Sequence, residues 1–157
     1  MTDGFTHLDG RGAARMVDVT AKEISVRTAT ATGRVLVSAE VVGLLRGAGV
    51  PKGDAIAVAR IAGIQAAKRT PDLVPLCHPI AIHGVEVDLF VEDGAVSIAA
   101  TVRTADRTGV EMEALTAVAV AGLALIDMVK AVDPAAVITD VRVESKSGGT
   151  SGGWSRP

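Results

Sequence analysis

The stretch VEVDLFVEDGAVSIAATV, residues 85–102, decides the fold class of this 157-residue chain. In its first half apolar residues alternate with polar ones, apart from Phe90, and in its second half apolar residues recur at every second position. Glu92-Asp93-Gly94 separates the two halves. Period-two alternation on both sides of a turn that contains Asp-Gly is typical of a β-hairpin with one buried face. The chain is therefore expected to contain an antiparallel sheet.

Helical patterns flank this hairpin on both sides. Before it, Asp54 introduces the run AIAVARIAGIQAAKR, and a shorter helix is expected to begin after Ser38 and to stop at Gly47. After it, residues 111–131 predict a long helix. The intervening TPDLVPLCHPI contains three prolines, which predict an ordered loop that is neither helix nor strand.

Two further strands lie outside these helices. Residues 23–37 favour β-structure, with a bulge expected at Gly33, and residues 137–144 alternate in the same way. The resulting order is strand, helix, strand, strand, helix, strand. This order predicts an α+β, ferredoxin-like βαββαβ fold: an antiparallel sheet with helices on one face, plus the extra short helix. We expect one domain over residues 1–157.

Composition limits the class of protein. Hydrophobic residues make up 48% of the chain but aromatic residues only 2%, and such aliphatic surplus is often buried between subunits. The uncharged run 114–126 is shorter than the roughly 20 residues that a membrane span needs. The N-terminus has no signal-peptide pattern, and Cys77 has no second cysteine to pair with. A cytoplasmic protein is expected.

The net charge and the two termini limit the class of protein less strictly than the hydrophobic composition does. A net charge of −2 and a pI near 5.9 argue against a nucleic-acid surface covering the whole domain, although a local cationic pocket stays compatible with them. Residues 1–15 are polar and contain glycine, which predicts an arm that is flexible or held by a partner. Residues 147–157 are rich in glycine and serine and are expected to be flexible.

The long helix carries the most informative side chains. Helical spacing places Glu113, Thr116, Asp127 and Lys130 within about a third of its circumference, and the rest is almost wholly apolar. By spacing alone, Asp127 and Lys130 are more often a surface ion pair. The sharper hypothesis is a proton-transfer pair in which partial burial shifts one pKa toward neutrality.

The length of this helix sets a geometric constraint. Glu113 and Asp127 face similar directions, but 14 residues of helix separate them by about 21 Å. One small-molecule pocket within one chain is not expected to touch both. Either the two residues serve different sites, or a second copy of the chain brings its own residue alongside. The aliphatic surplus favours the second option.

Other candidate groups are weaker on spacing alone. Cys77 and His78 are neighbours, which allows either a nucleophile pair or a histidine that only hydrogen-bonds within a rigid loop. The three histidines and the one cysteine show no zinc-ligand spacing. The segment KSGG, residues 146–149, resembles a phosphate-binding loop in composition only, since no helix follows it.

Taken together, four blocks of the sequence resemble one family closely, the cyclic pyranopterin monophosphate synthases, also known as molybdenum cofactor biosynthesis protein C. They cover about half of the chain, in the expected order. The blocks are THLDGRGAARMVDV (6–19), PKGDAIAVARIAGIQAAKRTPDLVPLCHP (51–79), RTGVEMEALTAVAVAGLALIDMVKAV (107–132) and KSGG (146–149).

The resemblance implies an enzyme, a lyase of the phosphorus-oxygen type. Its substrate would be (8S)-3′,8-cyclo-7,8-dihydroguanosine 5′-triphosphate, made by a preceding radical enzyme. Its products would be cyclic pyranopterin monophosphate and pyrophosphate. No resident cofactor or metal is implied, and Mg²⁺ accompanying the substrate phosphates is left open. The implied assembly is a hexamer, a trimer of dimers, with active sites between subunits and without nucleic-acid or membrane partners.

The same resemblance assigns roles to individual residues. The catalytic residues are Asp127, Lys130 and Lys52, with Asp127 and Lys130 as the acid–base pair. Positions that contact the substrate, including the basic residues that hold its triphosphate, are Leu76, Cys77, His78, Met112, Glu113, Glu111, Arg27, Lys68 and Lys146.

Three positions depart from the family pattern: Arg15, Arg107 and Ile126 replace a frequent histidine, lysine and tyrosine. Only Ile126, which removes a hydroxyl beside Asp127, would change hydrogen bonding near the mapped residues. Two alternatives remain, a non-catalytic ferredoxin-like nucleotide-binding regulator and an inactive paralogue. An RNA-binding domain of this fold is disfavoured because the hairpin offers only Phe90 for base stacking.

Overall fold

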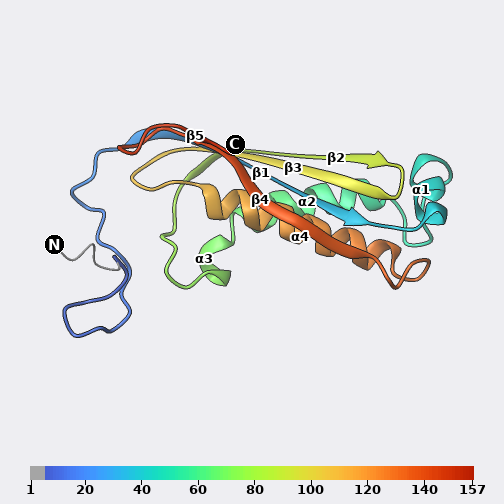
Figure 1. Cartoon of the computed structure of the whole chain (residues 1–157), viewed down its shortest axis with the longest axis horizontal. Coiled ribbons are helices and arrows are strands. Elements are labelled where there is room, and N and C mark those ends of the chain that lie inside the picture. Colours follow the sequence, from blue (N-terminus) through green and yellow to red (C-terminus); the bar gives the residue numbers. More distant parts are fainter. Residues whose placement is uncertain (1–5) are drawn as a thin grey trace.

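Five strands form one antiparallel sheet in the computed structural model, which describes residues 6–157 (Figure 1). Their order across the sheet is β2-β3-β1-β4-β5, and each neighbouring pair is antiparallel. Because β3 lies between β1 and β2, the first four strands have the split arrangement of ferredoxin-like folds, which confirms the predicted α+β class. The strands are β1 (Ser25–Leu36), β2 (Ile82–Glu92), β3 (Ala95–Asp106), β4 (Val137–Ser147) and β5 (Trp154–Ser155).

The hairpin of β2 and β3 is confirmed in detail. Glu92 pairs with Ala95, so Asp93 and Gly94 form a two-residue turn. Gly94 has a φ of 75°, a conformation that favours glycine. Val87 and Leu89 are buried, while the intervening Asp88 is exposed. The alternation in the sequence therefore corresponds to one buried and one open sheet face.

The bulge expected at Gly33 belongs instead to the opposite strand. Thr32 pairs with Arg142 and Arg34 with Thr139, so β4 uses one residue more than β1 across this interval. Asp140 lies in that interval with a φ of 56°, the only positive φ of a non-glycine residue within residues 6–157. A Cβ at Gly33 would approach the Val118 side chain to 2.7 Å. Gly33 thus allows a helix to approach the sheet closely.

Helices cover one face of the sheet (Figure 1). The N-caps of the first two were predicted correctly, because the Ser38 and Asp54 side chains accept hydrogen bonds from backbone N–H groups three residues later. The prediction that proline excludes helix from the following loop is wrong, since α3 forms one short turn with Pro71 at its start, where no N–H is needed. The helices are α1 (Ala39–Arg46), α2 (Ala55–Ala67), α3 (Thr70–Leu73) and α4 (Glu111–Val129).

Small residues let α2 and α4 pack tightly against each other. A Cβ at Gly63 of α2 would lie 2.9 Å from the Ala117 carbonyl oxygen and 3.2 Å from the Ala121 Cβ of α4. By length and composition α4 could cross a membrane, since an 18-residue stretch of it has a mean hydropathy of 1.8. However, 56% of that stretch is buried inside the fold. Burial against α2 and the sheet accounts for its apolar character, as in the core helix of a globular protein.

Both terminal segments contain local backbone pairing within residues 6–157. Trp154 and Ser155, within the glycine- and serine-rich tail, form β5 by pairing with Lys146 and Ser145 of β4. At the other end, residues 1–5 lie outside the described residues. From Thr6 onward the N-terminal segment turns back on itself through a bridge between Leu8 and Ala14.

Candidate active site

The C-terminal end of α4 carries a cluster of one carboxylate and two ammonium groups. The Asp127 carboxylate lies 2.8 Å from Lys130 Nζ through Oδ1 and 3.1 Å from Lys52 Nζ through Oδ2. Lys130 is the C-cap residue of α4, one turn beyond Asp127, so the helix itself aligns this pair. Lys52 comes from a separate loop. The structure therefore brings together the three residues that the resemblance implied to be catalytic.

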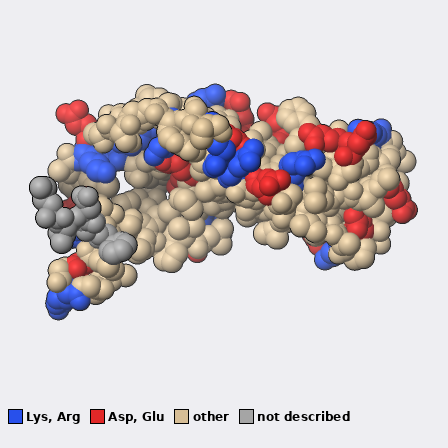
Figure 2. All heavy atoms as spheres, viewed as in Figure 1, with Lys and Arg blue, Asp and Glu red and all other residues tan. Residues whose placement is uncertain are grey.

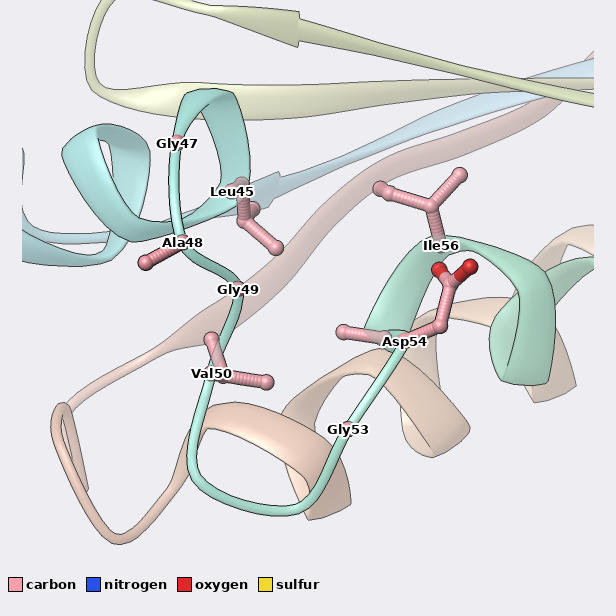
Figure 3. Close-up of a pocket in the computed structure, with 9 residues that line it drawn as sticks. Leu45, Gly47, Ala48, Gly49, Val50, Gly53, Asp54 and Ile56 are labelled. Atoms are coloured by element: carbon pink, nitrogen blue, oxygen red, sulfur yellow. The ribbon is translucent and has the colours of Figure 1, made fainter.

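A glycine-rich loop between α1 and α2 delivers Lys52 to Asp127. The backbone N–H of Gly53 donates to the Val50 carbonyl at 3.0 Å, which closes a tight turn with Lys52 inside it. Gly53 has a φ of 116°, and Asp54 then caps α2. Figure 3 shows this loop around a cavity of about 370 Å³ lined by Leu45, Gly47, Ala48, Gly49, Val50, Gly53, Asp54, Ala55 and Ile56. Lys52 lies between the lining residues Val50 and Gly53 in the chain, but the lining includes none of the mapped residues.

Asp127 is ionised at neutral pH in the isolated chain. Its side chain is 56% exposed, and hydrogen bonds from Lys130 and then Lys52 hold the pKa of Asp127 below its usual value. The sequence-based hypothesis that partial burial shifts a pKa of this pair toward neutrality is wrong for Asp127. The reason is that the polar stripe reaches solvent in the last turn of α4, where Asp127 is exposed although Met128 and Val129 stay buried.

At the N-terminal end of α4, a second set of mapped residues lines a cavity of about 290 Å³. Leu76, Cys77 and His78 contribute one wall, and Glu113 contributes another. His78 Nε2 lies 2.5 Å from the Val17 carbonyl oxygen, which ties the proline-rich loop to the N-terminal segment. Residues that sequence reasoning did not assign to this site also line it, namely Thr6, His7, Val17, Val19, Lys22 and Thr108.

Glu113 is the carboxylate with a neutral-range pKa. Only 3% of the residue is exposed, and this burial raises the pKa of Glu113 to about 7, with a smaller contribution from the charge of Glu111. Burial and the neighbouring Glu113 also raise the pKa of the Cys77 thiol. A raised thiol pKa means less thiolate at neutral pH, so the geometry does not favour Cys77 as an activated nucleophile.

Two mapped basic residues are held by specific contacts with Glu111 and with the segment that precedes α4. Lys146 Nζ lies 2.8 Å from Glu111 Oε1 at the first residue of α4. Arg27 donates from Nε to the Asp106 carbonyl at 3.1 Å and from Nη2 to the Arg107 carbonyl at 3.2 Å. On the face drawn in Figure 2, cationic and anionic side chains are interspersed and do not form a single-sign patch. Binding of an anion here would depend on individual cations rather than on a broad positive field.

The mapped residues thus divide into two groups at opposite ends of α4. Lys52, Asp127 and Lys130 occupy one end, while Glu111, Met112 and Glu113 occupy the other. Lys68 is exposed at the C-cap of α2, and that helix runs antiparallel to α4, which places Lys68 toward the Glu113 end. One chain brings together the members of each group but not the two groups.

A resident metal ion would need several ligands in one place. Within residues 6–157, no three histidine, cysteine, aspartate or glutamate side chains gather in a way that could hold one.

Comparison with known proteins adds independent findings. A model of the MoaC family matches residues 16–149. A protein of Streptomyces avermitilis named cyclic pyranopterin monophosphate synthase is 71% identical over 98% of this chain and 91% of its own length. Proteins with the same name from a Nocardioides species and from Parvibaculum lavamentivorans are 70% and 56% identical, covering 98% and 96% of this chain and 96% and 95% of their own lengths.

Proposed function

The chain belongs to the MoaC family of cyclic pyranopterin monophosphate synthases, enzymes of molybdenum cofactor biosynthesis, and we propose that its own reaction is the one that this name implies. The substrate is (8S)-3′,8-cyclo-7,8-dihydroguanosine 5′-triphosphate. The products are cyclic pyranopterin monophosphate and pyrophosphate, so the enzyme is a lyase. We place it in the cytoplasm.

The observation that carries this proposal is the cluster of Lys52, Asp127 and Lys130. Lys52 lies 75 residues before Asp127, yet the fold brings its ammonium group to 3.1 Å from the carboxylate. An ionised aspartate between two ammonium groups can accept a proton at one point and return it at another, provided that substrate displaces one lysine. Rearranging a purine imidazole ring into a pyrazine requires such transfers at nitrogen and oxygen.

The other end of α4 supplies groups for substrate binding and a second proton carrier. Arg27, Lys68 and Lys146 are cations for the triphosphate, and charge-assisted bonds to phosphate stabilise a departing pyrophosphate. Glu113, with a pKa of about 7, holds a proton that it can donate at neutral pH, whereas Asp127 is ionised and must first accept one. The aliphatic walls and Cys77 and His78 then enclose the base without aromatic stacking.

We propose that a complete site combines the two ends of α4 from two subunits. Glu113 and Asp127 are about 21 Å apart along one helix. One bound nucleotide derivative cannot bring its reacting atoms within proton-transfer distance of both. On the outer side of the helix layer, Val58 and Ile61 of α2 and Leu123 of α4 are exposed by 42%, 65% and 58%. A second copy covering this apolar face would bring its Glu113 end toward Asp127. A hexamer, a trimer of such dimers, follows from the family resemblance.

The direct test supplies purified protein with the cyclised dihydro-GTP and measures pyrophosphate and the pyranopterin product. We expect the two products to appear in equal amounts. Binding of the substrate by folded protein without turnover would instead support a nucleotide-binding regulator or an inactive paralogue. The assay is run with and without Mg²⁺, because the phosphates can recruit this ion from solution.

Shared sites predict complementation between two inactive variants. Glu113→Ala and Asp127→Asn chains are refolded together, and the mixed oligomer is expected to regain part of the wild-type activity. Random mixing gives some interfaces with an intact Glu113 from one chain and an intact Asp127 from the other. Native mass spectrometry confirms mixing. Confirmed mixing without recovery of activity would show that each site lies within one chain.

A further inference from the structure

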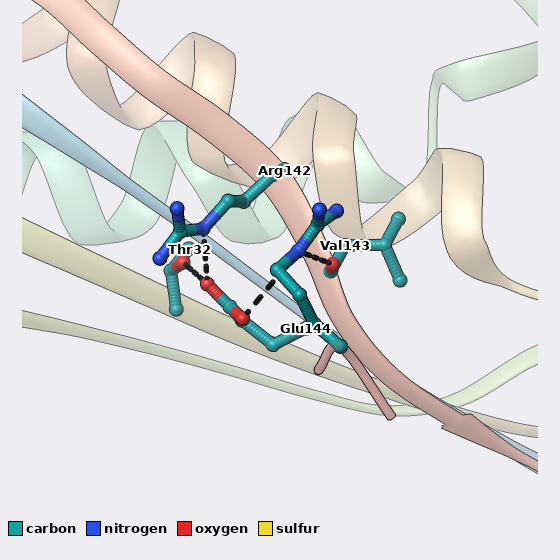
Figure 4. Close-up of polar contacts among 5 residues, drawn as sticks. Thr32, Arg142, Val143 and Glu144 are labelled. Carbon is teal, nitrogen blue, oxygen red and sulfur yellow. Dashed lines mark hydrogen bonds and ion pairs between the residues drawn. The ribbon is translucent and has the colours of Figure 1, made fainter. Parts of the chain in front are cut away.

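The carboxylate of Glu144 joins three segments on the open face of the sheet. It accepts a hydrogen bond from Thr32 Oγ1 of β1 at 2.5 Å and one from Arg142 Nε at 2.7 Å (Figure 4). Arg156, in the C-terminal tail, approaches it to 3.7 Å. The hydrogen bonds from Thr32 and then Arg142 hold the pKa of Glu144 below its usual value, so this carboxylate, the anchor of the tail, is ionised at neutral pH.

Arg156 uses its backbone and its side chain to fasten the tail to β4. Its backbone N–H donates to the Glu144 carbonyl at 2.7 Å, and its Nε donates to the Val143 carbonyl at 2.9 Å. The guanidinium also lies over the ring of Trp154, with its carbon 5.5 Å from the ring centroid, within range of a cation–π interaction. These contacts explain why a glycine- and serine-rich tail forms β5.

The residue that β5 holds in place is Lys146. Trp154 pairs directly with Lys146 across β4 and β5. Together with Glu111 and Val143, these two residues line a cavity of about 330 Å³. The Trp154 ring and the Glu111 carboxylate therefore restrict the long Lys146 side chain, which would otherwise sample many rotamers at a strand end.

The turn between β4 and β5 packs against Arg27. Gly148 and Gly149 have φ values of 90° and 78°, and a side chain at either would collide with the Val26 backbone or with the Arg27 guanidinium. The Arg27 guanidinium is thus enclosed between this turn and the backbone carbonyls of Asp106 and Arg107. Displacing β5 would loosen the turn and free the side chains of both Lys146 and Arg27.

We propose that β5 is a positioning element of the phosphate-binding site, in which Arg156 and Trp154 hold Lys146 and the turn through Gly149 against Arg27. The polyphosphate chain then meets two cations at a fixed separation. This inference rests on the proposed function for the identity of the ligand and for the roles of Arg27 and Lys146 as its cations. Arg156 and Trp154 themselves act through Lys146 and Arg27, at a distance from the acid–base cluster, so they affect binding and not the proton transfers.

The test uses Arg156→Ala in the full chain, with tripolyphosphate as the probe in calorimetry. We expect a Kd for tripolyphosphate about tenfold higher than in wild type, because binding must then order the released side chains. In the turnover assay, KM for the cyclised dihydro-GTP rises by a similar factor while kcat stays within about twofold. Trp154 is the only tryptophan and the chain has no tyrosine, so its emission reports release of β5 directly.

Arg46→Ala is the matched control. Arg46 likewise pairs with a carboxylate, Asp93 at 2.9 Å, and donates to a backbone carbonyl, that of Val91, but at the hairpin end of the sheet. The Arg46→Ala variant should leave both tripolyphosphate binding and Trp154 emission unchanged. If Arg156→Ala does not fold cooperatively, Glu144→Gln replaces it in the same comparison, since it weakens the anchor and keeps Arg156.

A released β5 with an unchanged Kd overturns the proposal, as does wild-type protein that binds no tripolyphosphate. A loss of kcat with KM unchanged also overturns it, because that result assigns β5 to the chemistry. Wild-type protein that binds tripolyphosphate through β5 but does not turn over the substrate contradicts the proposed function and leaves the positioning role intact.

Discussion

Asp127→Asn is expected to lower kcat by a factor of about 10² to 10⁴, the range over which a positioned acid–base group contributes to catalysis. Asparagine has the same shape but cannot accept and return a proton, and it no longer holds Lys130 at 2.8 Å and Lys52 at 3.1 Å by charge. The fold should tolerate the change, since exposed ion pairs contribute about 0–1 kcal/mol. Turnover and thermal unfolding of the same preparation separate the two effects.

Asp72→Asn provides the matched control for this substitution. Asp72 is also an exposed aspartate in an (i, i+3) ion pair, 3.3 Å from Arg69 Nε on α3. The Asp72→Asn substitution removes the same charge from a helix surface, and this variant should retain wild-type turnover. Wild-type kcat in the Asp127→Asn protein would remove Asp127 from the mechanism, whatever the family resemblance implies.

Glu113→Gln is expected to stabilise the protein above neutral pH and to lower its activity. Burial raises the pKa of Glu113 from 4.5 to about 7, so between these values the folded chain holds a proton that the unfolded chain has released. The contribution of Glu113 to the free energy of unfolding is therefore complete below pH 4.5 and is lost as pH rises through 7. Glutamine resembles the protonated side chain at every pH and avoids that loss.

The size of this effect follows from the shift. The free energy of unfolding of the variant minus that of wild type should be about 2 kcal/mol larger at pH 8 than at pH 4.5. This is less than the full pKa shift implies, because the carboxylate lines an open cavity. Urea unfolding followed by circular dichroism at the two pH values measures it. Turnover should fall at least tenfold, since an amide cannot donate the proton. Equal stability differences at both pH values would show that the pKa of Glu113 is the same in the folded and the unfolded chain.

Glu144→Gln is the control of opposite sign. The pKa of Glu144 is lowered by its bonds to Thr32 and Arg142, so its contribution to stability is present above pH 4.5 and is lost as pH falls through its folded pKa. This variant should be less stable than wild type at pH 8 and should approach wild type in acid. The two glutamates thus distinguish burial from hydrogen bonding as the cause of a pKa shift.

Local patterns were sufficient to predict most of the fold. The β2–β3 hairpin and α4 were identified from periodicity, and the caps at Ser38 and Asp54 from residue type. The short helix α3 was missed because proline was treated as a helix breaker, although it fits the first turn. The strand β5 was missed because its residues have no apolar pattern, and its stability comes from Arg156 and Glu144, which no local rule connects.

The candidate site was less accessible to sequence reasoning. Helical spacing alone predicted that Glu113 and Asp127 lie far apart on similar faces. Spacing could not tell which of the two is buried, and the pKa shift expected near Asp127 is found at Glu113. Burial depends on the sheet and α2, which are distant in sequence. Lys52 was assigned to the site only through the family motifs, and the lining residues from the N-terminal segment were missed.

The central position of β1 determines the order in which this chain can fold. Leu36 pairs with Ala95 on one side and with Val137 on the other, so the first strand to leave the ribosome has its partners in the second half of the chain. Both of its edges stay unpaired until β3 and then β4 have been synthesised, and such non-local pairing slows folding. Nascent chains stalled before residue 137 should therefore be the species most exposed to aggregation and most dependent on chaperones.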